Sequence, residues 1–393
     1  MNRYMNRRIV AYFLAFIALG MTSAALGPTL PGLAEQTSTQ LSGISFLFAT
    51  RSLGFLAGAI LAGRVYDRLP GHPLLMGLLL LMGVSLALVP LVSQLWLLTI
   101  LMFLAGFVES GVDVGSNTLL VWRFGEKVGP YMNSLHFFFG LGAFLSPIII
   151  AQTMLATGGG IRLAYWVLAL IVLPAAFAFI RFPSLPIRHR DTAVHGGKAN
   201  RLLVVLVATF LFLYVGAEVA YGGWIYTYAI TLGLSSATVA AYLTSFFWGS
   251  LTLGRLLSIP ITAKLHPKAL LSGALAGCLL SMAVLLVGQS SAVALWVGTI
   301  GLGLSMSVIF PTTIALAEHT LSLSGQMTSY FFVGAALGAM SIPWLIGQLF
   351  ETVGPVVTML IILATLLVAV AVFGLLIWQA RLHQEAKAAK LLT

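Results

Sequence analysis

The chain has 393 residues, of which 60% are hydrophobic and only 8% are charged. A soluble domain carries about a quarter charged residues because its surface faces water, so most of this surface must face lipid. The length holds about a dozen helices of roughly 20 residues, which leaves no room for a large extramembrane catalytic domain. The single cysteine, Cys278, excludes a disulfide framework and a cysteine-based zinc site.

Twelve apolar segments are predicted to cross the membrane as α-helices. Helices are favoured over a β-barrel because the apolar runs are continuous, whereas barrel strands alternate in short stretches. The first segment is expected to be a retained helix because its apolar run is long for a signal peptide and lacks a small-residue cleavage site. The segments span residues 9–30, 41–63, 73–92, 95–121, 130–154, 162–181, 201–229, 237–259, 269–288, 292–316, 327–349 and 355–379.

The distribution of lysine and arginine predicts the orientation. With the N-terminus inside, all basic residues fall in cytoplasmic segments except Arg162, which lies outside, and Arg51 and Arg255, which lie within spans. An excess of Lys and Arg in cytoplasmic loops is the usual bias of membrane proteins, and it also explains the net charge of +10. Both termini are therefore expected in the cytoplasm of a multi-pass protein, with a bacterial inner membrane as the expected location.

The chain is predicted to consist of two similar halves. A polar stretch at residues 182–200 separates residues 1–181 from residues 201–393 and is interpreted as a cytoplasmic linker. In the two halves Gly142 matches Gly338, Pro147 matches Pro343, and MNSLHFFFG at 132–140 matches MTSYFFVG at 327–334. Chance matching of Gly and Pro in apolar helices remains an alternative. Two like-oriented six-helix halves are typical of a rocking transporter and not of a pore.

The loop after the second span carries a family resemblance. GRVYDR, from Gly63 to Arg68, resembles the Gly-x-x-x-Asp-Arg loop of the major facilitator superfamily, although the following Leu-Pro-Gly-His departs from the family pattern. The resemblance implies a cytoplasmic gate in which Asp67 and Arg68 latch neighbouring helix ends. The alternative is that these are solvated loop charges.

Four further segments narrow the resemblance. GVDVGSN (111–117), HFFFGLGAFLSP (136–147), YVGAEVAYGGWIYTYA (214–229) and FPTTIALAE (310–318) together resemble the sodium-dependent glucose transporters and the fucose-proton symporters. The fifth span lacks the Gly-Pro dipeptide typical of drug-proton antiporters. The resemblance therefore implies symport and disfavours multidrug efflux.

The fourth span carries the candidate cation-coupling residues. Glu109, Asp113 and Asn117 recur at intervals of four, which places them on one helix face. Two carboxylates one turn apart resist joint ionisation, and a bound proton or a sodium ion with oxygen ligands relieves the repulsion. In the fucose symporters an acid followed four residues later by Asn couples the cation, and Asp113 and Asn117 match that pair. The alternative is a structural ion pair between Arg51 and either acid.

Candidate solute-binding residues lie in three other spans. Tyr221, Trp224 and Tyr228 offer flat faces for a sugar ring, Glu218 is an intramembrane acid on the same helix, and Gly222-Gly223 is expected to let the helix bend. An aromatic belt at the membrane surface is the alternative. Asn133 and His136 on the fifth span are further candidates, although His136 could alternatively be a packed histidine. Thr312 on the tenth span completes the set and follows an expected helix break at Pro311. Arg255 is interpreted as structural.

Three hypotheses follow. The first is a sodium- or proton-coupled symporter of a sugar or similar small polar solute. The second is an exporter of an amphipathic compound or lipid, and the third is a non-transporting receptor or assembly factor. No catalytic motif appears in a credible context, so no enzyme activity, cofactor or nucleic-acid partner is expected beyond the coupling ion, and the protein is expected to be monomeric.

Overall fold

The N-terminal part of the chain forms a bundle of membrane-spanning helices. The computed structural model describes residues 3–180, 182, 201–262, 264–320 and 325–392, and none of these lies in a β-strand. The expected linker therefore lies almost entirely outside the described residues. The elements of this part are α1 (Arg3–Gln36), α2 (Leu41–Ile44), α3 (Phe46–Tyr66), α4 (Gly71–Leu88), η1 (Val89–Leu91), α5 (Leu95–Phe124), η2 (Gly125–Val128), α6 (Gly129–Ala156) and α7 (Arg162–Phe177).

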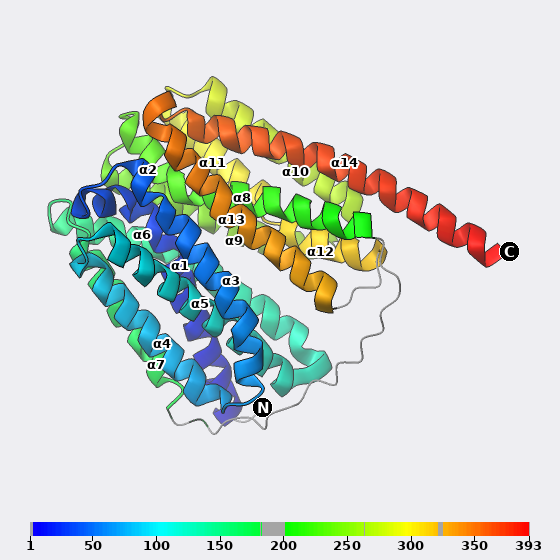
Figure 1. Cartoon of the computed structure of the whole chain (residues 1–393), viewed down its shortest axis with the longest axis horizontal. Helices are drawn as coiled ribbons and strands as arrows, with labels where there is room; N and C mark the ends of the chain where they lie inside the picture. The colour runs from blue at the N-terminus through cyan, green and yellow to red at the C-terminus, as the bar shows by residue number, and fades with distance from the viewer. Residues whose placement is uncertain (1–2, 181, 183–200, 263, 321–324, 393) are drawn as a thin grey trace.

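The C-terminal part forms a second bundle beside the first (Figure 1). Its elements are α8 (Arg201–Thr231), α9 (Ala237–Thr262), α10 (Pro267–Val287), α11 (Ala292–Met306), α12 (Ile309–Thr320), α13 (Gly325–Val353) and α14 (Val357–Leu392). Because α2 continues into α3 and α11 into α12, each of these pairs makes one span. The helices at the two chain ends, α1 and α14, run well past the expected apolar segments.

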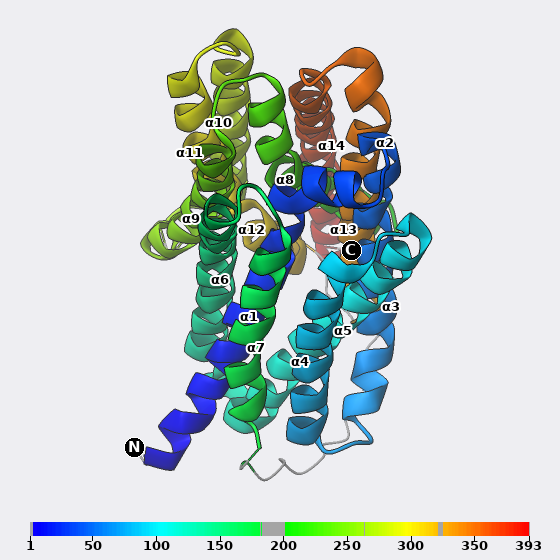
Figure 2. The ribbon, with the colours of Figure 1, turned by 90° about the vertical axis from the view of Figure 1, so that its left-hand side faces the viewer.

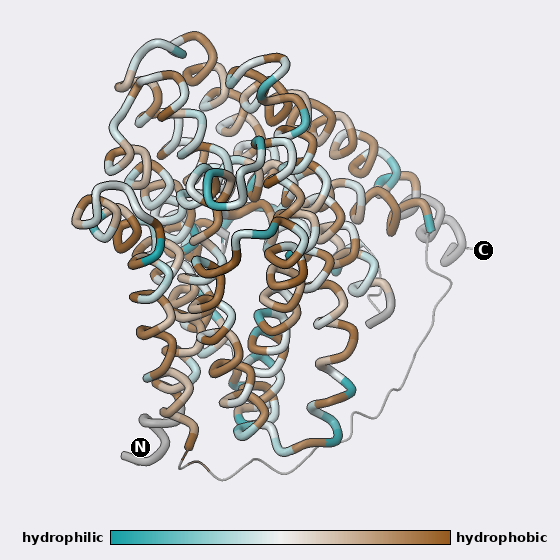
Figure 3. The backbone as a smooth tube through the Cα atoms, turned by 60° about the vertical axis from the view of Figure 1, so that its left-hand side comes forward, coloured by the Kyte–Doolittle hydropathy of each residue, from teal (hydrophilic) through white to brown (hydrophobic). Residues whose placement is uncertain are grey.

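The twelve predicted spans are confirmed as helices. Ten helical segments of the described chain are long and apolar enough to cross a membrane. Two predicted spans are not among these ten. The helix α7 is apolar but has only 16 residues, and α9 is long enough with 26 residues but is less apolar than the ten. Hydrophobic colour predominates along the helices in Figure 3. Large apolar side chains such as Trp96, Leu170 and Val287 are exposed on the outside of the bundles, as a lipid-facing surface requires.

The two bundles repeat the same helix pairing. In the first bundle α1 packs against α6, α3 against α5, and α4 against α7; in the second α8 packs against α13, α9 against α11, and α10 against α14. The matched glycines have the same place: a Cβ on Gly142 would strike the carbonyl of Ile17 on α1, and one on Gly338 would strike the carbonyl of Phe212 on α8. The sequence match between the halves therefore reflects a structural repeat.

The described contacts between the bundles gather at one end, here called the contact end, which carries the α1–α2 and α13–α14 connections. The main helix pairs that make them are α6 with α9, α3 with α13, α1 with α8, and α2 with α13. The opposite end, called the terminal end, carries both chain termini, and the ribbons of the two bundles diverge toward it in Figure 1. Figure 2 views the first bundle from the side, with the N-terminus at its lower end and α2 near the top.

Side-chain hydrogen bonds join the bundles at the contact end. Gln348 on α13 donates its side-chain amide to the carbonyl of Ser42 (2.8 Å) and to the hydroxyl of Ser45 (3.2 Å). Glu351 accepts from the backbone N–H of Leu41 at 2.9 Å, which caps α2 from the other bundle. These bonds close one end of the molecule around the beginning of α3.

Candidate functional site

An ion pair lies at the centre of the first bundle. Arg51 on α3 donates from Nε to Oε1 of Glu109 on α5 at 3.1 Å, and from Nη2 to Oε2. The Glu109 side chain is 1% exposed and that of Arg51 19%. A buried carboxylate needs such a partner, since desolvation without compensation is very costly. The structure thus realises the Arg51 ion pair, with Glu109 and not Asp113 as its acid.

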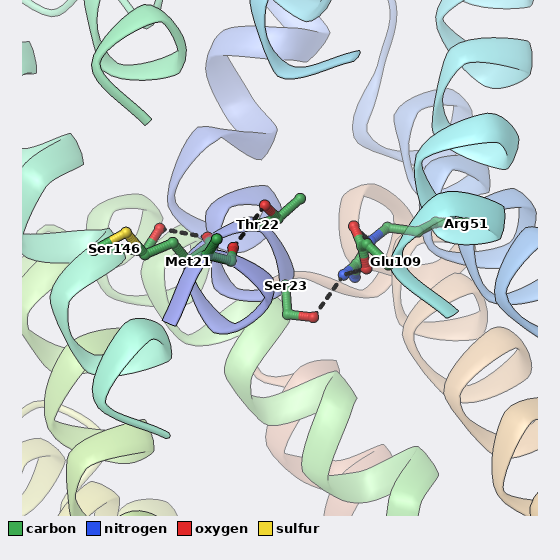
Figure 4. Close-up of polar contacts among 7 residues, drawn as sticks. Met21, Thr22, Ser23, Arg51, Glu109 and Ser146 are labelled. Carbon is green, nitrogen blue, oxygen red and sulfur yellow. Dashed lines mark hydrogen bonds and ion pairs between the residues drawn. The ribbon is translucent and has the colours of Figure 1, made fainter. Parts of the chain in front are cut away.

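The ion pair is tied to α1, which runs through the middle of the bundle (Figure 4). Arg51 also donates from Nη2 to the hydroxyl of Ser23 at 2.9 Å. Two residues earlier, the carbonyl of Met21 accepts from Ser146 on α6 at 2.7 Å. One short stretch of α1 therefore connects α3 and α5 on one side with α6 on the other.

Asp113 has a different environment from Glu109. Its Oδ1 accepts a 2.9 Å hydrogen bond from the side-chain amide of Asn117, which also donates to the Asp113 carbonyl. Within the described chain no cation lies at ion-pair distance from it. Both side chains are half-buried. The Asp113 carboxylate thus has no compensating positive charge among the described residues, whereas the Glu109 carboxylate one turn away is compensated by Arg51.

A small cavity lies beside the ion pair. Polar groups from five helices line it, namely Thr22, Arg51, Ser85, Glu109 and Tyr165. Tyr165 in turn hydrogen-bonds Thr29 at 2.8 Å. All lining residues belong to the first bundle, so this cavity is internal to one half and does not lie between the halves. In the described part of the chain no three metal-binding side chains cluster, here or elsewhere.

The three aromatic residues expected to hold a sugar are fully covered and do not share one surface. Trp224 donates from Nε1 to the carbonyl of Pro343 at 2.9 Å and stacks on Phe350 with ring centroids 5.1 Å apart. Tyr221 turns toward α9 and α11, where its hydroxyl bonds Thr299 at 2.7 Å. These two side chains and that of Tyr228 are at most 1% exposed, so they do not form a lipid-facing belt either.

The glycine pair on α8 does not interrupt the helix. α8 is continuous from Arg201 to Thr231. A Cβ on Gly222 would press against Trp248, and one on Gly223 against Phe48. The glycines instead let α8 come close to α3 and α9, and the carbonyl of Gly222 lies against Gly27 of α1. Their physical role is close packing between the halves.

Residues on α6 and α12 occupy contrasting positions. Asn133 and His136 are exposed on the part of α6 toward the terminal end, and the His136 ring meets Phe16 edge-on at 5.8 Å. His136 is therefore not a packed core histidine. Thr312 is 4% exposed, and its hydroxyl has no hydrogen-bond partner in the described chain.

The break in the tenth span lies slightly before the expected place. The helix is interrupted at Ser307 and Val308, one turn before Pro311. Because Pro311 lacks an N–H, it cannot continue the hydrogen-bond ladder to the preceding turn. The carbonyl of Met306 instead accepts from the Tyr214 hydroxyl on α8 at 2.9 Å. The Met306 carbonyl, just before the break, is thus satisfied by another helix.

The Gly63–Arg68 loop lies at the terminal end. Asp67 ends α3 and is half-buried, and Arg68 is exposed. Neither side chain forms an ion pair within the described residues. The latch that the family resemblance implies is thus not engaged in this conformation, in which the contacts between the halves lie at the other end.

Sequence reasoning missed two features of the site. Ser23 and Ser146 anchor the polar centre to α1, and serines in apolar helices give no signal of such a role. Arg255 was assigned only a structural role, yet its Nε is buried without a hydrogen-bond partner in the described chain. Its position within a span was the available signal, since intramembrane charges are usually functional.

Two repeated six-span halves with charged groups in their interior define a secondary-transporter fold. The sequence profile of the Major Facilitator Superfamily matches residues 11–343, and the chain belongs to this superfamily, whose members are transporters and not enzymes.

Curated relatives and solved structures agree with this assignment. Sodium-dependent glucose transporter 1 of Xenopus laevis is 34% identical, covering 84% of this chain and 73% of the relative. The human protein of the same name is 30% identical, covering 85% and 72%. The nucleoside transporter NupG has a similar fold, with TM-score 0.75 at 13% identity over 96% of this chain and 98% of that chain. A bacterial homologue of the lysosomal transporter Spinster, solved inward-facing and occupied, gives TM-score 0.71 at 10% identity over 99% and 98%.

Proposed function

We propose that the protein is a cation-coupled symporter that carries a sugar or similar small polar solute by alternating access. The observation that carries the proposal is the unequal state of the two acids on α5. Arg51 compensates Glu109, whereas Asp113 has only the Asn117 amide beside it. A carboxylate in this state gains most from binding a proton or sodium ion, since the cation supplies the missing charge.

The solute class comes from the relatives. Several curated relatives at 30% identity or more are named sodium-dependent glucose transporters. In the proposal, Asp113 and Asn117 supply oxygens to the cation, whereas Glu109 holds Arg51 in place and shapes the site. Asn133, His136, Glu218 and Thr312 contact the solute between the halves, and Tyr221, Trp224 and Tyr228 close over it from the contact end.

The conformation fits one stage of such a cycle. The halves meet at the contact end, and residues of α6 toward the terminal end are exposed. With both termini in the cytoplasm, as the basic residues predict, this is the state open to the cytoplasm. Gly63, Asp67 and Arg68 then form the gate that closes in the opposite state.

The test is uptake into proteoliposomes containing the purified protein. Labelled D-glucose should accumulate above its outside concentration when an inward sodium or proton gradient is imposed, and only equilibrate without one. The gradient that drives accumulation identifies the cation. Equilibration alone under both gradients would exclude coupling. Absence of any sugar movement, with efflux of an amphipathic dye instead, would favour the exporter hypothesis.

A further inference from the structure

The approach of α6 to α9 marks where the two halves begin to part. A Cβ on Gly140 of α6 would collide with the side chain of Thr252 on α9, so the helices touch there. At the contact end the same pair of helices is joined by a hydrogen bond from Gln152 to the Tyr242 hydroxyl. The helices run in opposite directions between these points. One turn beyond Gly140 and Thr252, toward the terminal end, lie His136 and Arg255.

Arg255 faces the protein and not the lipid. Its neighbours Leu253, Leu256 and Leu257 are between 41% and 55% exposed, whereas the Nε atom of Arg255 is buried and Gly254 packs against Ser307 of the tenth span. The guanidinium is therefore directed into the molecule, at the level where His136 is exposed on the other half.

The Arg255 guanidinium lies near an acid without pairing with it. Gly254 next to Arg255 packs against Ser307, and the adjacent Met306 carbonyl accepts from Tyr214, which lies one helical turn from Glu218 on α8. Arg255 is therefore close enough to act electrostatically on Glu218 and on His136 of α6. Within the described chain it nevertheless forms no ion pair, and its Nε has no hydrogen-bond partner. An arginine inside the membrane region normally pairs or hydrogen-bonds, because an unsatisfied buried charge is costly.

The acid is also short of a donor. The hydroxyl of Tyr214 lies against both the Met306 carbonyl, at 2.9 Å, and the Glu218 carboxylate. A tyrosine has a single hydroxyl proton, so it can satisfy only one of these two acceptors. Arg255 offers only donors and Glu218 only acceptors, whereas an alcohol offers both.

We propose that Arg255 is a solute-binding residue, and that a hydroxyl group of the solute bridges its guanidinium and the Glu218 carboxylate. This inference rests on the proposed function and specifies the solute class as a neutral polyol. The hydroxyl accepts from Arg255 and donates to Glu218, which satisfies both charged groups at once. A carboxylate on the solute is attracted by Arg255 but repelled by Glu218, so an acidic sugar is excluded.

The test is equilibrium binding to the purified protein, with labelled D-glucose displaced by unlabelled D-glucose or D-glucuronate. Arg255→Gln is expected to weaken glucose binding about tenfold or more, because it removes a hydrogen bond to a charged donor. Arg255→Lys should lose less, since it keeps the charge. Glu218→Gln should weaken glucose binding and raise the affinity for glucuronate relative to glucose about tenfold, because the repelling charge is gone.

The control is Arg162→Gln. Arg162 lies over the Trp166 ring on the outside of α7, 5.9 Å from its centroid, so this variant should bind glucose like the wild type. Thermal unfolding of each variant verifies that the protein is folded; if Arg255→Gln unfolds, Arg255→Lys and the glucuronate preference of Glu218→Gln decide.

Two results would overturn the inference in different ways. If folded Arg255 variants bind glucose with wild-type affinity and Glu218→Gln does not gain affinity for glucuronate, Arg255 is not a solute-binding residue. The proposed function is unaffected by that result. A wild-type protein that binds no sugar removes both.

Discussion

Arg51 and Glu109 form a buried ion pair that takes one of the two α5 carboxylates out of competition for a cation. Its neighbour on the same face, Asp113, is held only by Asn117. The two acids lie on one helix face but have opposite electrostatic surroundings. In the proposed function they therefore have different tasks: Glu109 fixes the arrangement of α1, α3 and α5, and Asp113 binds the coupling ion.

The ion pair leads to a prediction about stability. Arg51→Leu leaves the Glu109 carboxylate buried and unpaired, so we expect a loss of about 3–5 kcal/mol and a clear fall in the thermal unfolding temperature in detergent. Arg51→Leu combined with Glu109→Gln should recover much of that loss, because neither charge is then unpaired. Losses that simply add in the double variant would show that the two residues act independently.

Asp113→Asn separates carrying a solute from concentrating it. The amide keeps the size and hydrogen bonding of the side chain but removes the charge that a proton or sodium ion compensates. We expect gradient-driven accumulation in proteoliposomes to collapse, while exchange of labelled for unlabelled sugar survives in part, since exchange needs rocking without net cation movement. Full accumulation by the folded variant would transfer the coupling role to Glu109 or Glu218.

The hydrogen bonds at the contact end predict a shift between conformations. Gln348→Ala and Glu351→Ala each remove bonds that exist only while that end is closed. At about 1 kcal/mol per bond, Glu351→Ala, which removes one bond, should shift the equilibrium roughly fivefold toward opening of the contact end, and Gln348→Ala, which removes two, about thirtyfold. Spin labels on Ser38→Cys and Thr352→Cys, both exposed at that end, report the distance between the halves. Unchanged distance distributions in both variants would show that these bonds do not hold the end closed.

Trp224 is expected to affect both binding and closure. Trp224→Ala removes the ring contact with Phe48 of the other half, at 6.2 Å between centroids, together with the stack on Phe350 and the bond to the Pro343 carbonyl. It should therefore weaken glucose binding by about 1 kcal/mol or more and open the contact end in the same spin-label measurement. Trp224→Phe keeps a flat ring and should retain more of both. Loss of closure with unchanged sugar affinity would leave Trp224 a packing role only.

The orientation predicts the location of the chain ends. A fluorescent reporter fused after Thr393 should fold and fluoresce, and alkaline phosphatase at the same position should be inactive, because the positive-inside rule places this end in the cytoplasm. A reporter inserted near Thr192 should behave in the same way, and one inserted at Gly159 in the opposite way. Phosphatase activity at Thr393 would invert the assignment of the two ends.

Part of the candidate site could be predicted from spacing alone. Glu109, Asp113 and Asn117 lie on one helix by their interval of four residues, because helix geometry is local. Which acid Arg51 would pair with could not be predicted, since both lie on the same face and the choice depends on how far α3 is displaced along α5. The covered state of Trp224 and Tyr221 was equally inaccessible, because it results from α3, α9, α11 and α13 meeting around α8.

The sequence by itself determined the number of spans, the all-helical fold class and the repetition of the halves, because lipid demands long apolar helices and backbone hydrogen bonding within each one. The tertiary structure alone decided how the halves meet, where Gly222 and Gly223 act, and which charges are compensated. These features depend on distances between residues far apart in the chain, such as Arg51 and Glu109 or Leu41 and Glu351, and packing sets such distances only once all helices are in place.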